Sequence, residues 1–104
     1  MTNKACGMLG LCAKAGKSSS GEFACEKSIK SGKTRLCIIA SDASENTAKH
    51  FSDMCSYRKI PFFVCEEEKE KLGHLIGVKD RSVVTVDDAG FAKSLRVIIE
   101  GGSK

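Results

Sequence analysis

A continuous apolar stretch near the middle of the chain restricts the possible folds more than any other feature. The segment Thr34 to Ala40 reads TRLCIIA and contains five consecutive apolar residues, Leu36 to Ala40. Successive side chains of a strand point to opposite faces, so this pattern is typical of a strand buried on both sides. We therefore expect a sheet that is covered on both faces by other elements.

The rest of the chain alternates between helical and strand patterns with short connections. Spacing of apolar residues, capping residues and glycines predicts helices at Lys4 to Lys14, Glu22 to Ser31, Glu45 to Arg58, a short helix opened by the charged run 66–71, and a last helix after Asp88; strands are predicted at Ser18 to Ser20, Thr34 to Ala40, Ile60 to Cys65 and Ser82 to Val86. This order predicts an α/β protein, a three-layer α/β/α sandwich on a small mixed sheet of about four strands. The 104 residues are expected to form a single domain with a frayed tail at 101–104.

Positive charge is concentrated in one segment. Between Lys14 and Arg35 there are six Lys or Arg and two acids, so 6 − 2 = 4 positive charges, which equals the formal net charge of the whole chain. A modest excess of lysine is often only a solvated surface, but it is also compatible with a nucleic-acid partner. Any electrostatic attraction for an anion is expected near the helix in this segment.

One short motif resembles a phosphate-binding loop and fails the test for it. Gly16, Lys17 and Ser18 match the end of the P-loop pattern, which requires another glycine five residues before Gly16. That position holds Leu11, and a helix rather than a strand is predicted to precede the motif. We therefore expect no nucleotide site and no cofactor.

The cysteines, histidines and aspartates give no support for a metal site or a catalytic centre. The six cysteines contain no C-x-x-C pair, and His50 and His74 have no partner at ligand spacing. There is no signal peptide and no apolar run of roughly 20 residues, so we expect reduced thiols and a cytoplasmic protein without a membrane partner. Asp42, Asp87 and Asp88 follow predicted strands but also suit turns and helix starts, so we expect no enzyme.

Several patches taken together carry a resemblance to a known family. They are Gly10 to Lys17, Ser20-Gly21-Glu22, Ser31-Gly32-Lys33, Ile39 to Ser44, Ile60-Pro61, Leu72-Gly73-x-x-Ile76-Gly77 and Asp88-x-Gly90-Phe91-Ala92-Lys93. In this order and spacing the chain, from about Lys4 to Ile99, resembles the L7Ae/L30e family of ribosomal proteins, in particular its small bacterial branch. The resemblance implies an α/β/α sandwich that binds kink-turn RNA, a sharply bent internal loop flanked by sheared G·A pairs.

The resemblance also implies which residues contact RNA. In the family, a helix that begins at the glycine matching Gly21 enters the widened major groove, and an Asn, a Glu and a Lys on it contact the G·A pairs and backbone. Gly21 and Lys27 match, whereas Phe23 and Ala24 replace the Asn and the Glu. A Phe cannot hydrogen-bond a base edge but can stack on an unstacked base, so strict kink-turn specificity is not implied. The second contact loop corresponds to Gly77 through Ser82, where Lys79 and Arg81 replace apolar residues and favour phosphate contacts.

These observations predict a non-catalytic, ribosomal-protein-like RNA-binding protein, with ribosomal or other structured RNA and the ribosome itself as possible partners. The expected RNA-binding residues are Lys17, Ser20, Gly21, Glu22, Phe23, Lys27, Lys30, Lys33, Lys79 and Arg81. For Lys27 and Lys30 the alternative is a solvated helix face, and for Phe23 it is burial against the first helix. The alternative function is a protein-interaction adaptor, because stress-response adaptors share this fold.

Overall fold

The computed structural model describes residues 1–101 and has the predicted order of elements. They are α1 Asn3–Lys14, β1 Ser18–Ser20, α2 Glu22–Lys30, β2 Leu36–Ile39, α3 Glu45–Arg58, β3 Phe62–Val64, α4 Lys69–Leu75, β4 Val83–Val86 and α5 Ala89–Gly101. Gly101 ends α5, and the remainder of the predicted frayed tail lies outside the described residues.

The four strands form one mixed sheet in the order β1-β4-β2-β3. β4 is antiparallel to both of its neighbours, with Ser18 opposite Val86 and Leu36 also opposite Val86. β2 and β3 are parallel, with Cys37 opposite Phe62. The predicted class, a small mixed sheet of four strands within an α/β fold, is therefore confirmed.

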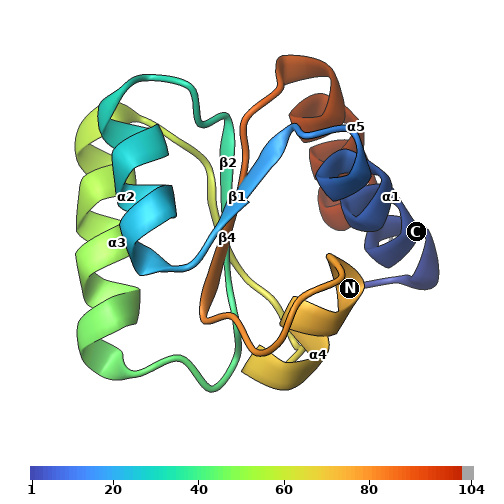
Figure 1. Ribbon diagram of the computed structural model, residues 1–104. Coiled ribbons are helices and arrows are strands. Elements are labelled where there is room, and N and C mark those ends of the chain that lie inside the picture. The colour runs from blue at the N-terminus through green and yellow to red at the C-terminus, as the bar shows by residue number, and fades with distance from the viewer. Residues whose placement is uncertain (102–104) are drawn as a thin grey trace.

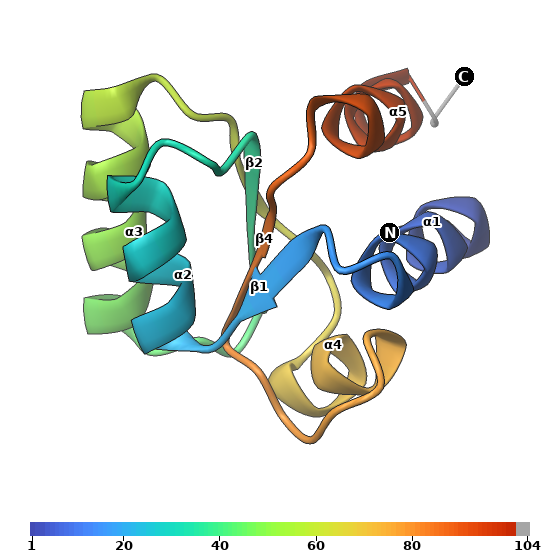
Figure 2. The same ribbon diagram turned by 45° about the horizontal axis from the view of Figure 1, so that its top comes forward.

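Helices cover both faces of this sheet, as the apolar strand predicted. In Figures 1 and 2, α2 and α3 lie on one side of the sheet and α1, α4 and α5 on the other. Along β2, Leu36 and Ile38 pack with the α1, α4 and α5 side, whereas Cys37 and Ile39 pack with Phe51 on the α2 and α3 side. Burial of β2 on both faces thus produces the three layers.

Short polar residues begin three of the helices. The Thr2 hydroxyl accepts a hydrogen bond from the Ala5 amide, the Ser44 hydroxyl accepts one from Thr47, and the Asp88 carboxylate accepts one from Phe91. Such caps satisfy amides that have no partner inside the helix. They explain why these helix starts lie where the sequence predicted them.

The charged run 66–71 does not open α4 as predicted, because the helix begins only at Lys69. The Lys69 amide donates to the Asp42 carboxylate at 2.7 Å, and Asp42 lies in the turn after β2. A cap supplied from 27 residues away has no local signal in the sequence. The predicted strands at 34–40 and 60–65 are also shortened to 36–39 and 62–64.

Candidate nucleic-acid interface

The start of α2 has the geometry of an open anion-binding helix end. Gly21 precedes the helix with φ +86°, a conformation that favours glycine, and its amide donates to the Val83 carbonyl at 3.0 Å. Among residues 1–101, no side chain caps the helix at this position. The first-turn amides, starting with that of the exposed Glu22, therefore add to the positive end of the helix dipole.

The loop of residues 77–82 lies directly beside this helix start. The Arg81 guanidinium donates from Nε to the Ser20 hydroxyl at 3.1 Å, and from Nη1 to the Asp80 carbonyl at 2.8 Å. A Cβ at Gly21 would lie 3.9 Å from the Arg81 side chain. The structure therefore brings together Ser20, Gly21, Glu22 and Arg81 from two segments that are 61 residues apart.

Close packing against α4 fixes the path of this loop. The Val78 amide donates to the Gly73 carbonyl at 3.0 Å, and the Arg81 amide donates to the Lys69 carbonyl at 3.0 Å. A Cβ at Gly73 would lie only 1.4 Å from the Lys79 carbonyl oxygen, so the loop backbone occupies the space of a side chain. Gly73 thus positions the loop. The glycine at this place in the family pattern has a steric reason, because a side chain would collide with the loop backbone.

A groove of about 550 Å³ runs along α2 beside β1. Three lysines line it, Lys17 before β1, Lys27 on α2 and Lys33 after α2, together with Phe23. The Phe23 side chain is 85% exposed, so the alternative that it is buried against α1 is wrong. An exposed aromatic ring next to lysines can stack on a base while the lysines contact phosphates.

The groove also contains residues that are absent from the predicted set. Ser31 lines it one helical turn beyond Lys27, so the groove face of α2 continues to Ser31 and not to Lys30. Asp87 lines it too, but its carboxylate accepts hydrogen bonds from the Ser19 hydroxyl at 2.6 Å and the Thr34 hydroxyl at 3.1 Å. The spacing Phe23, Lys27, Ser31 was the signal for this face, whereas the hydrogen bonds of Asp87 are long-range.

Lys30 lies apart from this groove. Its ammonium is 3.0 Å from the Glu26 carboxylate, whose other oxygen is 2.7 Å from His50 Nε2 on α3. The hydrogen bond with His50 and then the one with Lys30 hold the pKa of the Glu26 carboxyl below its ordinary value. Lys30 therefore belongs to an ion-paired contact between α2 and α3.

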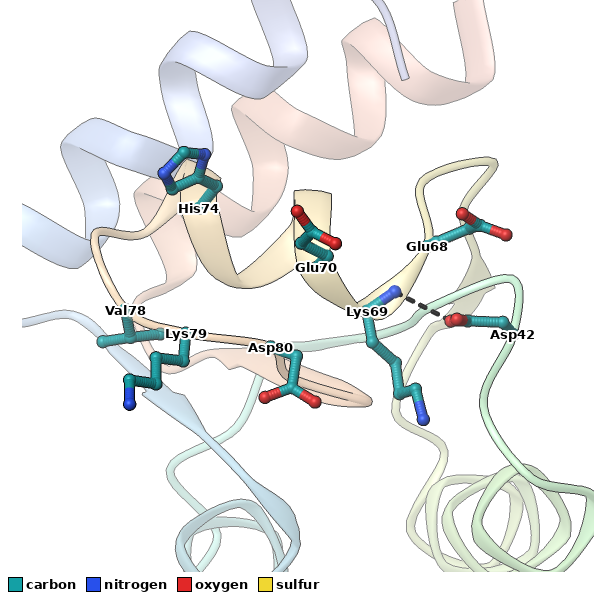
Figure 3. A pocket seen from close by; sticks show the side chains of 8 residues that line it. All are labelled: Asp42, Glu68, Lys69, Glu70, His74, Val78, Lys79 and Asp80. Atoms are coloured by element: carbon teal, nitrogen blue, oxygen red, sulfur yellow. Dashed lines mark hydrogen bonds between the residues drawn. The ribbon is translucent and has the colours of Figure 1, made fainter.

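Lys79 faces a hollow of mixed charge of about 510 Å³, which Figure 3 shows. Four acidic side chains line it with His74, Lys69 and Lys79, and one of them, Asp42, is the α4 cap. Among residues 1–101, no group of His, Cys, Asp and Glu is arranged to hold a metal ion. Four acidic side chains make this hollow unfavourable for phosphate. Lys79 therefore lies in a different hollow from the groove that Lys17, Lys27 and Lys33 line.

The six cysteines are free thiols, and five of them are buried. Burial raises the pKa of Cys25 to about 12 and that of Cys12 to about 11. A thiol that stays protonated at neutral pH is a poor nucleophile. The five buried cysteines, Cys12, Cys25, Cys37, Cys55 and Cys65, pack in the apolar clusters on the two faces of the sheet as small apolar residues, whereas Cys6 is only half-buried. In the described part of the chain, no helix has the length and apolar character needed to cross a bilayer.

Comparison with known proteins agrees with this architecture. The chain is 40% identical over 93 residues to "RNA-binding protein YlxQ" of Bacillus subtilis (strain 168), covering 89% of this chain and 92% of that protein. It is 32% identical over 78 residues to "Large ribosomal subunit protein eL8" of Picrophilus torridus, covering 74% and 61% of the two chains. A solved structure of a protein with unknown function from Bacillus halodurans C superposes with a TM-score of 0.90 at 35% identity, covering 95% of this chain and 99% of that one. Residues 4–96 match the family described as "Ribosomal protein L7Ae/L30e/S12e/Gadd45 family", so the chain belongs to that family.

Proposed function

We propose that this protein is a non-catalytic RNA-binding protein that contacts bent, kink-turn-like RNA with the start of α2 and the loop of residues 77–82. The observation that carries the proposal is the hydrogen bond from Arg81 to Ser20, which holds the loop beside the uncapped helix start. The two segments form one continuous surface, whereas either alone would be a small target. The names of the relatives, an RNA-binding protein and a ribosomal protein, support an RNA partner, and ribosomal RNA in the cytoplasm is its most natural source.

Each part of the surface has a different physical task. The amides at the start of α2 and the Arg81 guanidinium bind phosphate oxygens, because a helix N-terminus and a planar cation both favour anions. Phe23 stacks on a base that the bend leaves unstacked, and Lys27 contacts the backbone beside it. Because Phe23 and Ala24 cannot read G·A pairs by hydrogen bonds, recognition depends on RNA shape and charge more than on sequence.

An equilibrium titration tests this function directly. Labelled kink-turn RNA and a straight duplex of the same length are titrated with the protein at two salt concentrations. We expect tighter binding to the bent RNA and an affinity that falls steeply with salt, since phosphate contacts release counterions. Absence of binding to either RNA at low salt would overturn the proposal and favour the adaptor alternative.

Two lysines on the same helix provide a matched pair of variants. Lys27→Ala removes a lysine that lines the groove, whereas Lys30→Ala removes one that pairs with Glu26. We expect Lys27→Ala to weaken binding about three- to tenfold and to reduce the salt slope by about one phosphate contact, with a smaller effect for Lys30→Ala. Equal effects would mean that the RNA senses only the total charge of the protein.

A further inference from the structure

We propose that a second cationic surface, at the end of the sheet where β2 and β3 begin, binds phosphates of the RNA that flanks the segment held by α2. This surface, here called the basic edge, consists of Arg35, Lys59, Lys93 and Arg96. The inference rests on the proposed function and extends it, because it adds a separate contact for a flanking part of the same RNA.

The basic edge is assembled from two connections and one helix that meet at one end of the sheet. Arg35 lies between α2 and β2, Lys59 lies between α3 and β3, and Lys93 and Arg96 lie on α5 after β4. In Figure 1 the α2–β2 connection, the α3–β3 connection and the start of α5 gather at the same end of the molecule, at the top of the view. Together the four side chains line a hollow of about 410 Å³.

The charge of this hollow is almost uncompensated. Its one acidic lining residue, Glu100, is engaged by Arg96, with 3.1 Å between the Arg96 Nε and a Glu100 oxygen. Within residues 1–101, the cations Arg35, Lys59 and Lys93 form no ion pair. Unpaired cations from several elements around a hollow produce a local positive potential that attracts an anion.

The backbone at Lys59 is a second, independent observation. Lys59 ends α3 with φ +58°, and among the described residues it is the one non-glycine residue in the left-handed region. Glycine is favoured at such a helix end because a side chain there is strained. Within residues 1–101 the exposed Lys59 side chain forms no ion pair that would offset this strain, so its ammonium can contact an external ligand.

The basic edge continues from the lysine groove, and this identifies nucleic acid as the ligand. Lys33 lines the groove and Arg35, two residues later, lines the edge. The Arg35 amide donates to the carbonyl of Val86, the last residue of β4, at 2.8 Å. Asp87, which follows Val86, donates its amide to the Lys17 carbonyl at 2.8 Å. The end of β4 therefore holds the groove and the edge side by side. A path of cations that turns around one end of the sheet suits the regularly spaced phosphates of a long polyanion.

Two RNAs and two variants test the inference. One RNA contains the kink-turn alone, and the other contains it with both flanking helices extended by about one helical turn. Lys59→Gly and Lys93→Ala each remove a cation from the basic edge, and Lys4→Ala removes an exposed lysine at the far end of α1 from Lys17. Melting temperatures are measured alongside the dissociation constants.

We expect the wild-type protein to bind the extended RNA more tightly than the short one. Each edge variant should weaken binding to the extended RNA about three- to tenfold, lower its salt slope by about one, and leave the short RNA unaffected. Lys59→Gly should leave the melting temperature unchanged or raise it by roughly 2 to 5 °C, because the strain is relieved. If Lys59→Gly binds the extended RNA more weakly but melts at the same or a higher temperature than the wild type, the loss of binding cannot come from a loss of stability.

Three outcomes would overturn the inference. If both edge variants bind the extended RNA as the wild type does, the basic edge is not an RNA-binding surface, and an acidic protein would be the remaining candidate ligand for it. If the edge variants weaken binding to the short and extended RNAs equally, or weaken it no more than Lys4→Ala does, the effect comes from the total charge of the protein. In both cases binding of the short RNA by the wild type leaves the proposed function intact, whereas failure to bind either RNA removes both.

Discussion

At the scale of single residues, the proposed RNA-binding surface depends on the backbone at two glycines, Gly73 and Gly21, and on the exposed ring of Phe23. Gly73 allows the carbonyl of Lys79 to approach where a Cβ would be, and Gly21 begins α2 with a positive φ. Phe23 is exposed beside Lys27, although its ring is the most apolar group on that face of α2. Each of these residues matters for a stated contact, and each contact can be removed separately.

Gly73→Ala tests the packing of α4 against the loop. The added methyl group would overlap the Lys79 carbonyl, so the loop must move, and we expect destabilisation by about 3 kcal/mol or more. Urea denaturation measures this change. Gly7→Ala in α1 is the matched control, since nothing lies within 4 Å of its added Cβ, and it should stabilise the protein by about 1 kcal/mol. Similar stability of the two variants would contradict the packing described for Gly73.

Phe23→Ala tests stacking on a base. We expect RNA binding to weaken by about 1 to 3 kcal/mol while the melting temperature stays the same, because the ring is exposed and not part of the core. Tyr57→Ala provides the comparison, as Tyr57 is 83% exposed on α3 and does not line the groove. A lower melting temperature with intact RNA binding would assign Phe23 to the fold.

At the scale of elements, the sequence predicts the helices and strands that depend on local patterns, but it does not predict the hydrogen bonds between distant segments. The strand at β2 and the helix Glu45–Arg58 with its Ser44 cap follow from periodicity and capping alone. The capping of α4 by Asp42, and the contact of Arg81 with Ser20, join segments that no local pattern relates. Similarly, Lys30 was expected to bind RNA together with Phe23 and Lys27. In the structure Lys30 pairs with Glu26, which also contacts His50, on another side of α2.

The pair of α2 and α3 gives a prediction about pH. The lowered pKa of Glu26 means that the ionised carboxylate is favoured in the folded state. Its contribution to stability is therefore complete above the pKa of an unfolded Glu, about 4.3, and is lost as pH falls through the lower folded value. We expect Glu26→Gln to lower the melting temperature at pH 7, and we expect its difference from the wild type to shrink as pH falls below about 4.3. A constant difference across this range, measured by thermal unfolding, would show that Glu26 acts through packing and not through its charge.

At the scale of the whole molecule, the proposed contacts form two neighbouring regions that meet near the end of β4. The start of α2 and the loop of residues 77–82 lie together, and the lysine groove runs from there along α2 toward Lys17 and Lys33. The basic edge lies around the end of the sheet that these lysines approach. The fold family was predictable from motifs spread over the chain, whereas this arrangement of charge was not, because its members come from distant parts of the sequence.

The most direct test of the central claim is a map of backbone amide chemical shifts during titration with kink-turn RNA. We predict that the largest changes occur together at residues 21–27 and 77–82, with smaller changes at Lys17 and Lys33. Residues 45–54 of α3 should remain unchanged, since they lie outside the proposed contacts. Changes confined to a single one of the two segments, or centred elsewhere on the molecule, would contradict the account that Ser20 and Arg81 join them into one RNA-binding surface.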